Sequence, residues 1–375
     1  MSRAYLDHAA SSPVLPAAVE AMRRLLGVPG NPSSLHTSGR TMRRHLEEAR
    51  ESLAADLGAQ PAELVFTSGG TEANNLALMG SLPCLLQGAA IAVSAVEHPS
   101  VADVGQRWPR LVRLPVDSGG HLDLSASADQ LSGVGLLSMM WVNNETGAIQ
   151  PITEVTRLAR GVGARVHSDA VQAFGHVTID FGATGLDLMS VSAHKIGGPV
   201  GIGALVVRRG VVLRPVGFGG QQEARIRSGT VPVALAAGFA AAAREASERL
   251  RDEGRRLVGL RERVLSALPA VVPEALVNGA APVSPAILNI TVPGTRADDV
   301  LLGLDAAGID CSTGSACSAG VHQPSEVLLA MGRSLADAGA SLRFSFGSST
   351  TTADVDALLA ALPAAVGRAR AAFGA

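Results

Sequence analysis

The chain has 375 residues, 47% of them hydrophobic and 17% charged, a composition that can bury a large core and favours two domains or more. The net charge of −2 and the lack of a basic run argue against nucleic acid as the main partner. With no signal-peptide pattern, no apolar stretch long enough to span a bilayer, and only three cysteines, we expect a cytoplasmic protein with no membrane partner.

The stretch from about residue 61 to 207 alternates short β-rich runs with helical patterns. This alternation predicts an α/β fold with a mainly parallel sheet. Ligands of such sheets bind in the loops beyond the carboxyl ends of the strands, so the residues that follow each run are the first candidates for a site. The predicted strands are 64–66, 91–93, 136–142, 165–167, 188–190 and 204–207.

The first of these loops, residues 67–75, follows the strand at 64–66 and has the sequence TSGGTEANN. A glycine turn that opens a helix offers backbone N–H groups, and together with Gly70 and the Thr71 hydroxyl it suits a phosphate monoester. Taken alone, the same residues are better explained as ordinary helix capping.

A histidine follows the next predicted strand, in the sequence Glu97-His98-Pro99. The imidazole of His98 could stack on a planar cofactor and transfer protons near neutral pH. A structural histidine with satisfied hydrogen bonds explains it equally well.

Two polar residues follow the strand at 165–167. The carboxylate of Asp169 could pair with a protonated pyridine nitrogen, which keeps such a ring cationic and able to store negative charge. Gln172 could donate a hydrogen bond to a ring hydroxyl. An aspartate after a strand is more often a helix N-cap, so this signal also needs support from its neighbours.

The strand at 188–190 runs into a glycine-proline turn that carries Ser192, His194 and Lys195. Among the 31 lysine and arginine residues, Lys195 is the single lysine. Either residue type supplies surface charge, but only a primary amine can lose its proton and form a Schiff base. The alternative is a surface lysine that has remained by chance. The other candidate site residues near Lys195 make this alternative less convincing.

The C-terminal part begins with a helical pattern from about 233 to 268, long enough to link two domains. The rest predicts a smaller α+β domain, with strands at 287–292 and 342–346 and helices at about 296–307 and 352–372. We expect a large domain over residues 13–252 and a small domain made of 1–12 and 253–375.

Cys317 lies among small residues, a composition that predicts a mobile loop suited to a sulfur carrier. As a nucleophile it must be a thiolate, with an unperturbed pKa of about 8.5. A metal site with Cys311 and His322 is the first alternative, but the spacing fits no common zinc pattern and a fourth ligand is missing. An inert buried thiol is the second, and this is our interpretation of Cys84 and Cys311.

Together these motifs resemble the cysteine desulfurases of the NifS/IscS type, within the class V, fold-type I pyridoxal-phosphate enzymes. The resemblance covers nearly the whole chain, and ten ordered matches are far more specific than any one of them. The matching motifs are residues 5–10, 31–34, 66–75, 97–98, 143–145, 167–172, 194–195, 227–230, 314–317 and 342–344.

The resemblance implies a seven-stranded sheet between helices and a pyridoxal phosphate bound to Lys195. It also implies a homodimer with shared active sites, because the family's equivalent of Thr230 reaches the phosphate in the neighbouring subunit. Substrate carboxylate would bind Arg343, whose guanidinium is well shaped for it. The other implied roles are Asp169 for the pyridine nitrogen, Gln172 for the ring hydroxyl, His98 for stacking and proton transfer, Asn144 for cofactor and substrate, and Gly70, Thr71, Ser192 and His194 for the phosphate.

The implied reaction removes sulfur from L-cysteine, giving L-alanine and a persulfide on Cys317. That sulfur would pass to an acceptor such as an iron–sulfur scaffold or a protein that thiolates tRNA or cofactors. In the family this cysteine can also be a transient iron–sulfur ligand shared with a scaffold. The alternatives are a selenocysteine lyase, another class V aminotransferase-type enzyme, or a scaffold that keeps the fold without catalysis.

The sequence departs from the family pattern in three places. Ala193 stands where glycine is usual, Ser11 and Ser12 stand where two threonines are common, and residues 218–223 replace a run richer in glycine. None of these changes removes a predicted catalytic group. We expect no extended acceptor-docking tail after the last predicted helix, which leaves the identity of the acceptor open.

Overall fold

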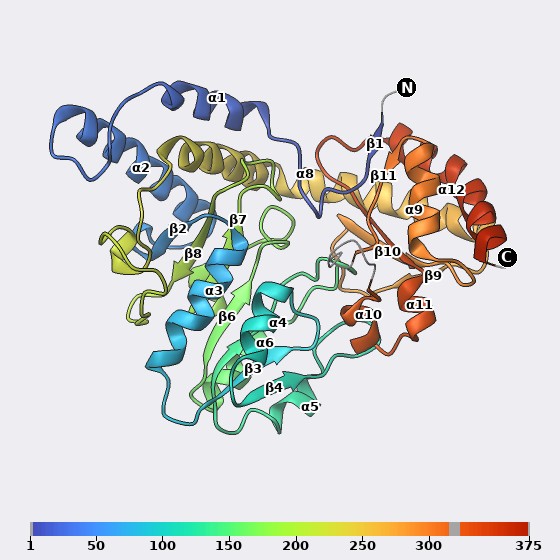
Figure 1. Cartoon of the computed structure of the whole chain (residues 1–375), viewed down its shortest axis with the longest axis horizontal. Helices are drawn as coiled ribbons and strands as arrows, with labels where there is room; N and C mark the ends of the chain where they lie inside the picture. The colour runs from blue at the N-terminus through green and yellow to red at the C-terminus, as the bar shows by residue number, and fades with distance from the viewer. Residues whose placement is uncertain (1–2, 315–322, 374–375) are drawn as a thin grey trace.

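A computed structural model describes residues 3–314 and 323–373. Figure 1 shows a larger α/β body built around one sheet and a smaller body of strands and helices, with the long helix α8 running between them. The N-terminal and C-terminal ends of the described chain both lie on the smaller body (Figure 1).

The larger body is built on a seven-stranded sheet. β8 runs antiparallel to both of its neighbours, while the other adjacent pairs are parallel. Five central strands are buried along almost their whole length, as expected for a sheet covered on both faces. The predicted α/β class and mainly parallel sheet are confirmed. The strand order is β2 (Leu64–Thr67), β8 (Gly203–Val207), β7 (Leu188–Ser192), β6 (Arg165–Asp169), β5 (Val134–Ser138), β3 (Ala90–Ser94) and β4 (Leu111–Leu114).

Two strand predictions differ from the structure. The strand predicted over 136–142 begins at Val134 and ends at Ser138; beyond it the chain keeps only separate backbone bonds to β6, such as Trp141 N–H to Asp169 O at 2.8 Å. The edge strand β4 was not predicted. It has four residues, of which Leu114 is buried, Leu111 and Val112 are half-buried and Arg113 is exposed, so it is too short for a clear pattern.

Helices cover the sheet on both faces. α3 packs against β7 and β8 through its small and apolar residues, which places its first turn over the carboxyl edge of the sheet. α2 and α1 pack against the first half of α8. The helices of this body are α1 (Pro16–Leu26), α2 (Thr37–Asp56), α3 (Gly70–Ser81), α4 (Pro99–Gln106), α5 (Leu124–Ala128), α6 (Ile152–Gly161) and α7 (Phe181–Thr184), with short 3₁₀ turns η1 (Pro61–Glu63), η2 (Leu82–Cys84) and η3 (Glu223–Arg225).

α8 (Val233–Val271) contributes to two separate hydrophobic clusters. Its buried residues from Val233 to Ala243 belong to the core under the seven-stranded sheet, whereas Leu257, Leu260 and Val264 belong to the core of the smaller body. The long linking helix is therefore confirmed. The domain boundary at residue 252 stays a prediction, which the two clusters support.

The smaller body contains the strands and helices predicted for it, β10, β12, α9 and α12. It also contains β1, which pairs with β11, so the N-terminal segment starts here and crosses to the larger body, where Ser12 N–H donates to His194 O at 2.8 Å. The elements are β1 (Ala4–Tyr5), β9 (Leu276–Asn278), β10 (Ile287–Thr291), α9 (Ala297–Ala306), β11 (Ile309–Asp310), α10 (Glu326–Ala330), α11 (Leu335–Gly339), β12 (Ser341–Ser345) and α12 (Thr352–Phe373).

Gly203 offers a test of how tightly the sheet edge is packed. A Cβ added there would lie 2.7 Å from both the Gly69 backbone carbon and the Val191 carbonyl oxygen, neither of which can move freely. We expect Gly203→Ala to destabilise the chain by about 1–3 kcal/mol, measured by denaturant unfolding. As a control, Gly259→Ala in α8 meets no atom within 4 Å and should stabilise by about 0.5–1 kcal/mol. Equal effects of the two substitutions would contradict this packing.

Candidate active site

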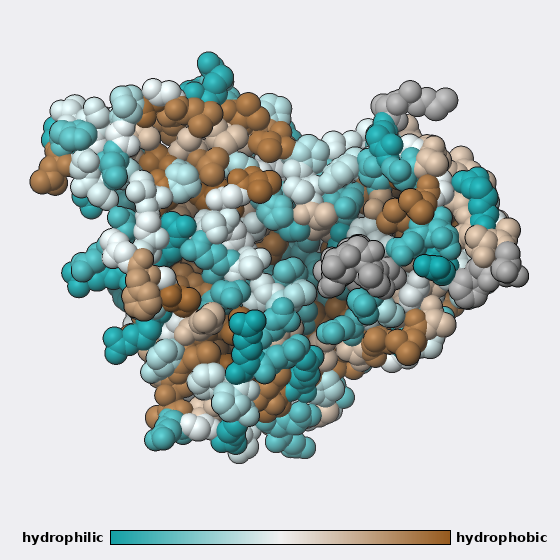
Figure 2. Space-filling model, viewed as in Figure 1, coloured by the Kyte–Doolittle hydropathy of each residue, from teal (hydrophilic) through white to brown (hydrophobic). Residues whose placement is uncertain are grey.

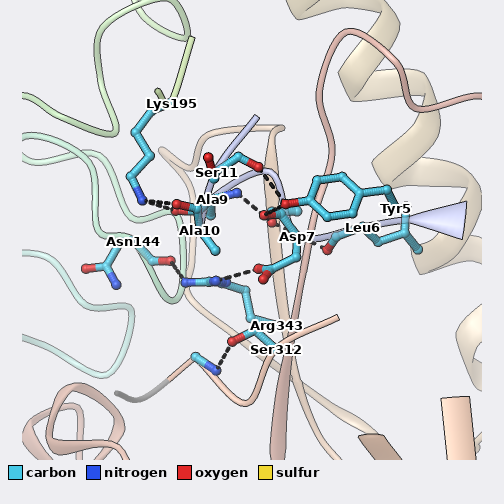
Figure 3. Close-up of polar contacts among 12 residues, drawn as sticks. Tyr5, Leu6, Asp7, Ala9, Ala10, Ser11, Asn144, Lys195, Ser312 and Arg343 are labelled. Carbon is cyan, nitrogen blue, oxygen red and sulfur yellow. Dashed lines mark hydrogen bonds and ion pairs between the residues drawn. The ribbon is translucent and has the colours of Figure 1, made fainter. Parts of the chain in front are cut away.

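Lys195 lies in the loop that follows β7 and is half-buried. Its Nζ donates hydrogen bonds to the carbonyl oxygens of Ala9, at 2.5 Å, and Ala10, at 2.8 Å (Figure 3). Burial lowers the pKa of Lys195 from 10.5 to about 8, and the nearby Arg343 charge adds to this effect. At pH 7 about a tenth of this amine is then unprotonated, far more than for a solvated lysine, and a nucleophilic amine must be unprotonated to react.

Asp169 ends β6 beneath the same edge and is buried. One of its carboxylate oxygens accepts from Asn74 Nδ2 at 2.6 Å, and the other accepts from Val171 N–H at 2.9 Å. Each oxygen has capacity for another donor. A hydrogen-bonded turn and no helix follows Asp169, so the helix N-cap interpretation is wrong, and the bond from α3 holds the carboxylate toward the site.

Gln172 is buried one turn later and donates from Nε2 to Ala9 O at 2.7 Å. The Ala9 carbonyl therefore accepts from both Gln172 and Lys195. This shared acceptor brings two predicted site residues together, although they come from loops after different strands.

His98 is the N-cap residue of α4. Its Nδ1 accepts from Ser100 N–H at 3.1 Å and lies 2.7 Å from Ser100 Oγ. Burial lowers its pKa, and the Lys195 charge lowers it further, while Asp169 acts in the opposite sense. Nδ1 therefore has the structural role proposed as the alternative for this histidine. Nε2 stays available for proton transfer, and the ring for stacking.

The first turn of α3 has the features of an anion site. A Cβ on Gly70 would lie 2.7 Å from Val171 Cγ2, so only glycine allows the helix start to approach this closely. Ser192 Oγ is buried without a hydrogen-bond partner, and Ser192 Cβ would lie 3.6 Å from a Cβ added at Gly70. An unsatisfied buried hydroxyl beside a helix N-terminus fits a phosphate group. Thr71 is exposed at the same turn.

His194 lies beside Lys195, with Nδ1 3.4 Å from Ser11 Oγ. Burial, together with the Lys195 charge, lowers the pKa of His194 to about 4. The imidazole is therefore neutral in the free chain and would act toward a phosphate as a hydrogen-bond donor rather than as a cation.

Arg343 on β12 brings the smaller body to the site. Its Nη2 binds Asp7 Oδ1 at 2.7 Å and its Nη1 donates to Asn144 O at 3.0 Å (Figure 3). Nε is buried without a partner, so one donor of this guanidinium is left for a ligand. The structure therefore brings Asn144, Arg343 and Lys195 into one region.

One predicted residue among those that the structure describes is not joined to this group. Thr230 is exposed and lines a groove beside α2. Cys317, like His322, lies outside the described residues. Burial raises the pKa of Cys311 to about 12, so that thiol stays protonated, as its structural interpretation requires. In the described ranges no group of three His, Cys, Asp or Glu side chains could hold a metal ion.

The structure adds residues that the sequence did not single out. Asn74 orients Asp169, and Asp7 orients Arg343 from 336 positions away. The only signal for Asn74 was its place one helical turn after Gly70, which puts it on the face of α3 that looks toward the sheet. No local pattern predicts the backbone carbonyls of Ala9 and Ala10 as acceptors.

A third addition is Glu97, which is buried and accepts from Ser94 Oγ at 2.6 Å and Met140 N–H at 2.7 Å. Burial raises its pKa to about 8, with a further contribution from Asp169. Glu97 is therefore mostly protonated at neutral pH.

These residues fit pyridoxal phosphate. The chain offers a desolvated amine, a buried carboxylate with spare acceptor capacity, a helix start with an unsatisfied hydroxyl, and a guanidinium with a free donor. Each feature matches a different part of the cofactor or of an amino-acid substrate.

The pKa of Lys195 can be tested in the cofactor-free chain. As the single lysine, it can be followed by acylation at increasing pH with peptide mapping, which separates it from the N-terminal amine. Because only the unprotonated amine reacts, labelling should be slow below the folded-state pKa and half-maximal at pH about 8. In denaturant the midpoint should return toward about 10.4. A folded-state midpoint as high as the denatured one would contradict the desolvated site.

Comparison with known proteins agrees with this geometry. The model of the aminotransferase class-V family matches residues 4–358. The chain is 47% identical to an IscS-like cysteine desulfurase of Mycobacterium tuberculosis, covering 98% of this chain and 97% of that protein. It is 38% identical to the cysteine desulfurase IscS of Dictyoglomus turgidum, covering 94% and 91%.

Among solved structures, a NifS-like protein from Rickettsia africae superposes with a TM-score of 0.89 at 31% identity, covering 97% of this chain and 99% of that one. With this coverage the match extends over both bodies. The chain therefore belongs to the aminotransferase class-V family of pyridoxal-phosphate enzymes and, within it, to the cysteine desulfurases of the NifS/IscS type.

Proposed function

We propose that this enzyme takes sulfur from L-cysteine, releases L-alanine, and holds the sulfur as a persulfide on Cys317. The observation that carries the proposal is the desolvated amine of Lys195, which lies near enough to the buried Asp169 and to the guanidinium of Arg343 for both charges to act on it. This is an arrangement for an amino acid bound through its carboxylate while its α-carbon is activated.

Bound pyridoxal phosphate supplies an electron sink for the negative charge that develops at the substrate α-carbon. In this proposal Asp169 holds a proton at the pyridine nitrogen, Gln172 donates to the ring hydroxyl, and His98 stacks on the ring. Gly70, Thr71, Ser192 and His194 bind the phosphate.

Lys195 then has a second task, which is to carry the proton of the substrate α-carbon on Nζ. A general base works best when its pKa is near the working pH, and burial has already lowered the pKa of Lys195 to about 8. The carbonyls of Ala9 and Ala10 give the amine a resting position within reach of the site.

Arg343 binds the substrate carboxylate, assisted by Asn144. The ion pair with Asp7 and the bond to the Asn144 carbonyl fix the plane of the guanidinium before substrate arrives. The free Nε then offers a charge-assisted hydrogen bond without reorganisation.

The sulfur transfer forms one S–S bond and breaks one C–S bond. The Cys317 thiolate attacks the sulfur of the substrate, the electron pair of the C–S bond stays with the β-carbon, and that carbon takes a proton to become the methyl group of alanine. The described residues just before Cys317 support this assignment. Ser312 pairs through its backbone with Arg343, and Arg343 N–H donates to Ser312 O at 2.7 Å. The segment that contains Cys317 thus starts at the substrate site.

The proposal includes a cytoplasmic homodimer in which Thr230 reaches the phosphate in the partner subunit. Apolar side chains gather over α1 in Figure 2, and Val19 and Leu26 of this helix are exposed. Such a patch supports contact with a second copy. Among the described helices none is long and apolar enough to cross a membrane.

The sulfur acceptor is proposed as a protein, such as an iron–sulfur scaffold or a thiolation protein. Transient binding of iron–sulfur by Cys317 belongs to the same proposal, and a pull-down with the persulfide form of the enzyme would test both.

Substitution of Ser192 tests the phosphate site, because it should not harm the stability of the cofactor-free chain but should weaken cofactor binding. In the free chain its hydroxyl is buried without a partner, so Ser192→Ala should leave stability unchanged or slightly raised. With cofactor the lost bond to phosphate should weaken pyridoxal-phosphate affinity about tenfold, measured by absorbance titration. A variant that loses stability but binds cofactor normally would contradict the site.

Cys317 tests the reaction. Cys317→Ala should keep the absorbance of the bound cofactor and abolish alanine and sulfide formation from cysteine in the presence of a reductant. Cys311→Ala is the matched control, since its thiol stays protonated, and it should keep activity. Substantial turnover by Cys317→Ala would sink the assignment. Retained alanine formation from selenocysteine alone would favour a selenocysteine lyase.

A further inference from the structure

Residues 217–230 form a surface segment between β8 and α8 that we call the arm. It carries Thr230 and the almost fully exposed Phe218, at 95%. The arm is organised by its own hydrogen bonds, from Ser228 Oγ to Gly220 O at 2.7 Å and from Gly229 N–H to Gln222 Oε1 at 3.0 Å. It is therefore a shaped element, although it is exposed along most of its length.

The arm contains three consecutive non-glycine residues in left-handed backbone conformations. The φ angles are 40° for Glu223, 54° for Ala224 and 64° for Arg225. Residues with a Cβ avoid this region, so a run of three persists only where surrounding contacts impose it.

The contact that imposes it is made by Glu223, which is buried. Its carboxylate accepts two bonds from Arg50 on α2, at 2.9 and 2.6 Å, and a third from Phe66 N–H at 2.7 Å. Arg50 is fixed in turn by a 2.6 Å bond to Leu64 O. Glu223 thus ties the arm to β2, the strand that leads directly into the phosphate site at Gly70.

A second carboxylate makes a parallel connection. Glu72, in the first turn of α3, binds Arg227 Nε at 2.9 Å and accepts from Ser68 N–H at 2.5 Å. The arm is therefore attached to its own subunit at Glu223 and at Arg227, next to the phosphate site, yet Thr230 lines an exposed groove of that subunit instead of joining Lys195.

We infer that Glu223 is a positioning residue that acts on the other subunit: it fixes the strained arm so that Thr230 completes the partner's phosphate site. This inference rests on the homodimer proposed above. In this inference the buried carboxylate of Glu223 offsets the strain of the three left-handed residues. It thereby fixes the point at which the arm leaves the surface, and so the site that Thr230 can reach.

Hybrid dimers with one reactive site test the direction of the effect. In the first hybrid, a Lys195→Ala subunit is paired with a Glu223→Gln subunit, so that the reactive site receives an intact arm. In the second, a subunit with both substitutions is paired with wild type, so that the reactive site receives the altered arm. Borohydride reduction fixes pyridoxal phosphate only on the remaining Lys195, and mass spectrometry measures the cofactor concentration that half-saturates it.

We expect the second hybrid to need about tenfold more cofactor than the first, and the first to match a Lys195→Ala and wild-type hybrid. Arg227→Gln, in the same pairings, should act in the same direction and serves if Glu223→Gln does not fold. Glu47→Gln is the matched control, because Glu47 pairs with Arg50 from the exposed side at 3.0 Å without touching the arm. It should shift neither hybrid.

Equal shifts in both hybrids, a shift only in the first, or no shift at all would each overturn the inference. A wild-type chain that is monomeric by light scattering would overturn the proposed dimer as well. A dimer that shows the expected shift but makes no alanine from cysteine would overturn the proposed reaction and leave the role of Glu223 standing.

Discussion

The active site depends on one partly buried amine, that of Lys195, which lies where the two bodies of the protein meet. Lys195 comes from the larger body, but its hydrogen-bond acceptors, the Ala9 and Ala10 carbonyls, belong to the N-terminal segment that starts in the smaller body. Burial lowers the pKa of the amine, and Arg343, brought by β12, adds to it. The site exists only where the two bodies meet.

The two bodies of the protein supply different parts of the active site. The larger body supplies the rigid parts, namely Asp169 at the end of β6 and the helix start at Gly70, both fixed by buried sheet and helix packing. The smaller body supplies the group for the substrate, Arg343, oriented through Asp7. A cofactor can therefore be held by one body while substrate binding engages the other.

Much of this could be predicted from sequence because the signals were local. The strand-loop pattern placed Gly70, Asp169 and Lys195 at one sheet edge, and the single lysine identified the amine. What could not be predicted depends on contacts between distant residues: the Asp7 and Arg343 pair, the Asn74 bond to Asp169, and the carboxylate of Glu223 on Phe66 N–H join segments 336, 95 and 157 positions apart. Their residue types carry no sign of their partners.

The account stands on Lys195 as the residue that binds the cofactor. The most direct measurement is borohydride reduction of the cofactor-loaded enzyme, followed by peptide mass spectrometry. The account predicts one fixed pyridoxyl group, on the peptide that contains Lys195, and none in Lys195→Ala. A fixed group on the N-terminal amine instead, or a loaded enzyme in which reduction leaves the Lys195 peptide unmodified, would contradict it.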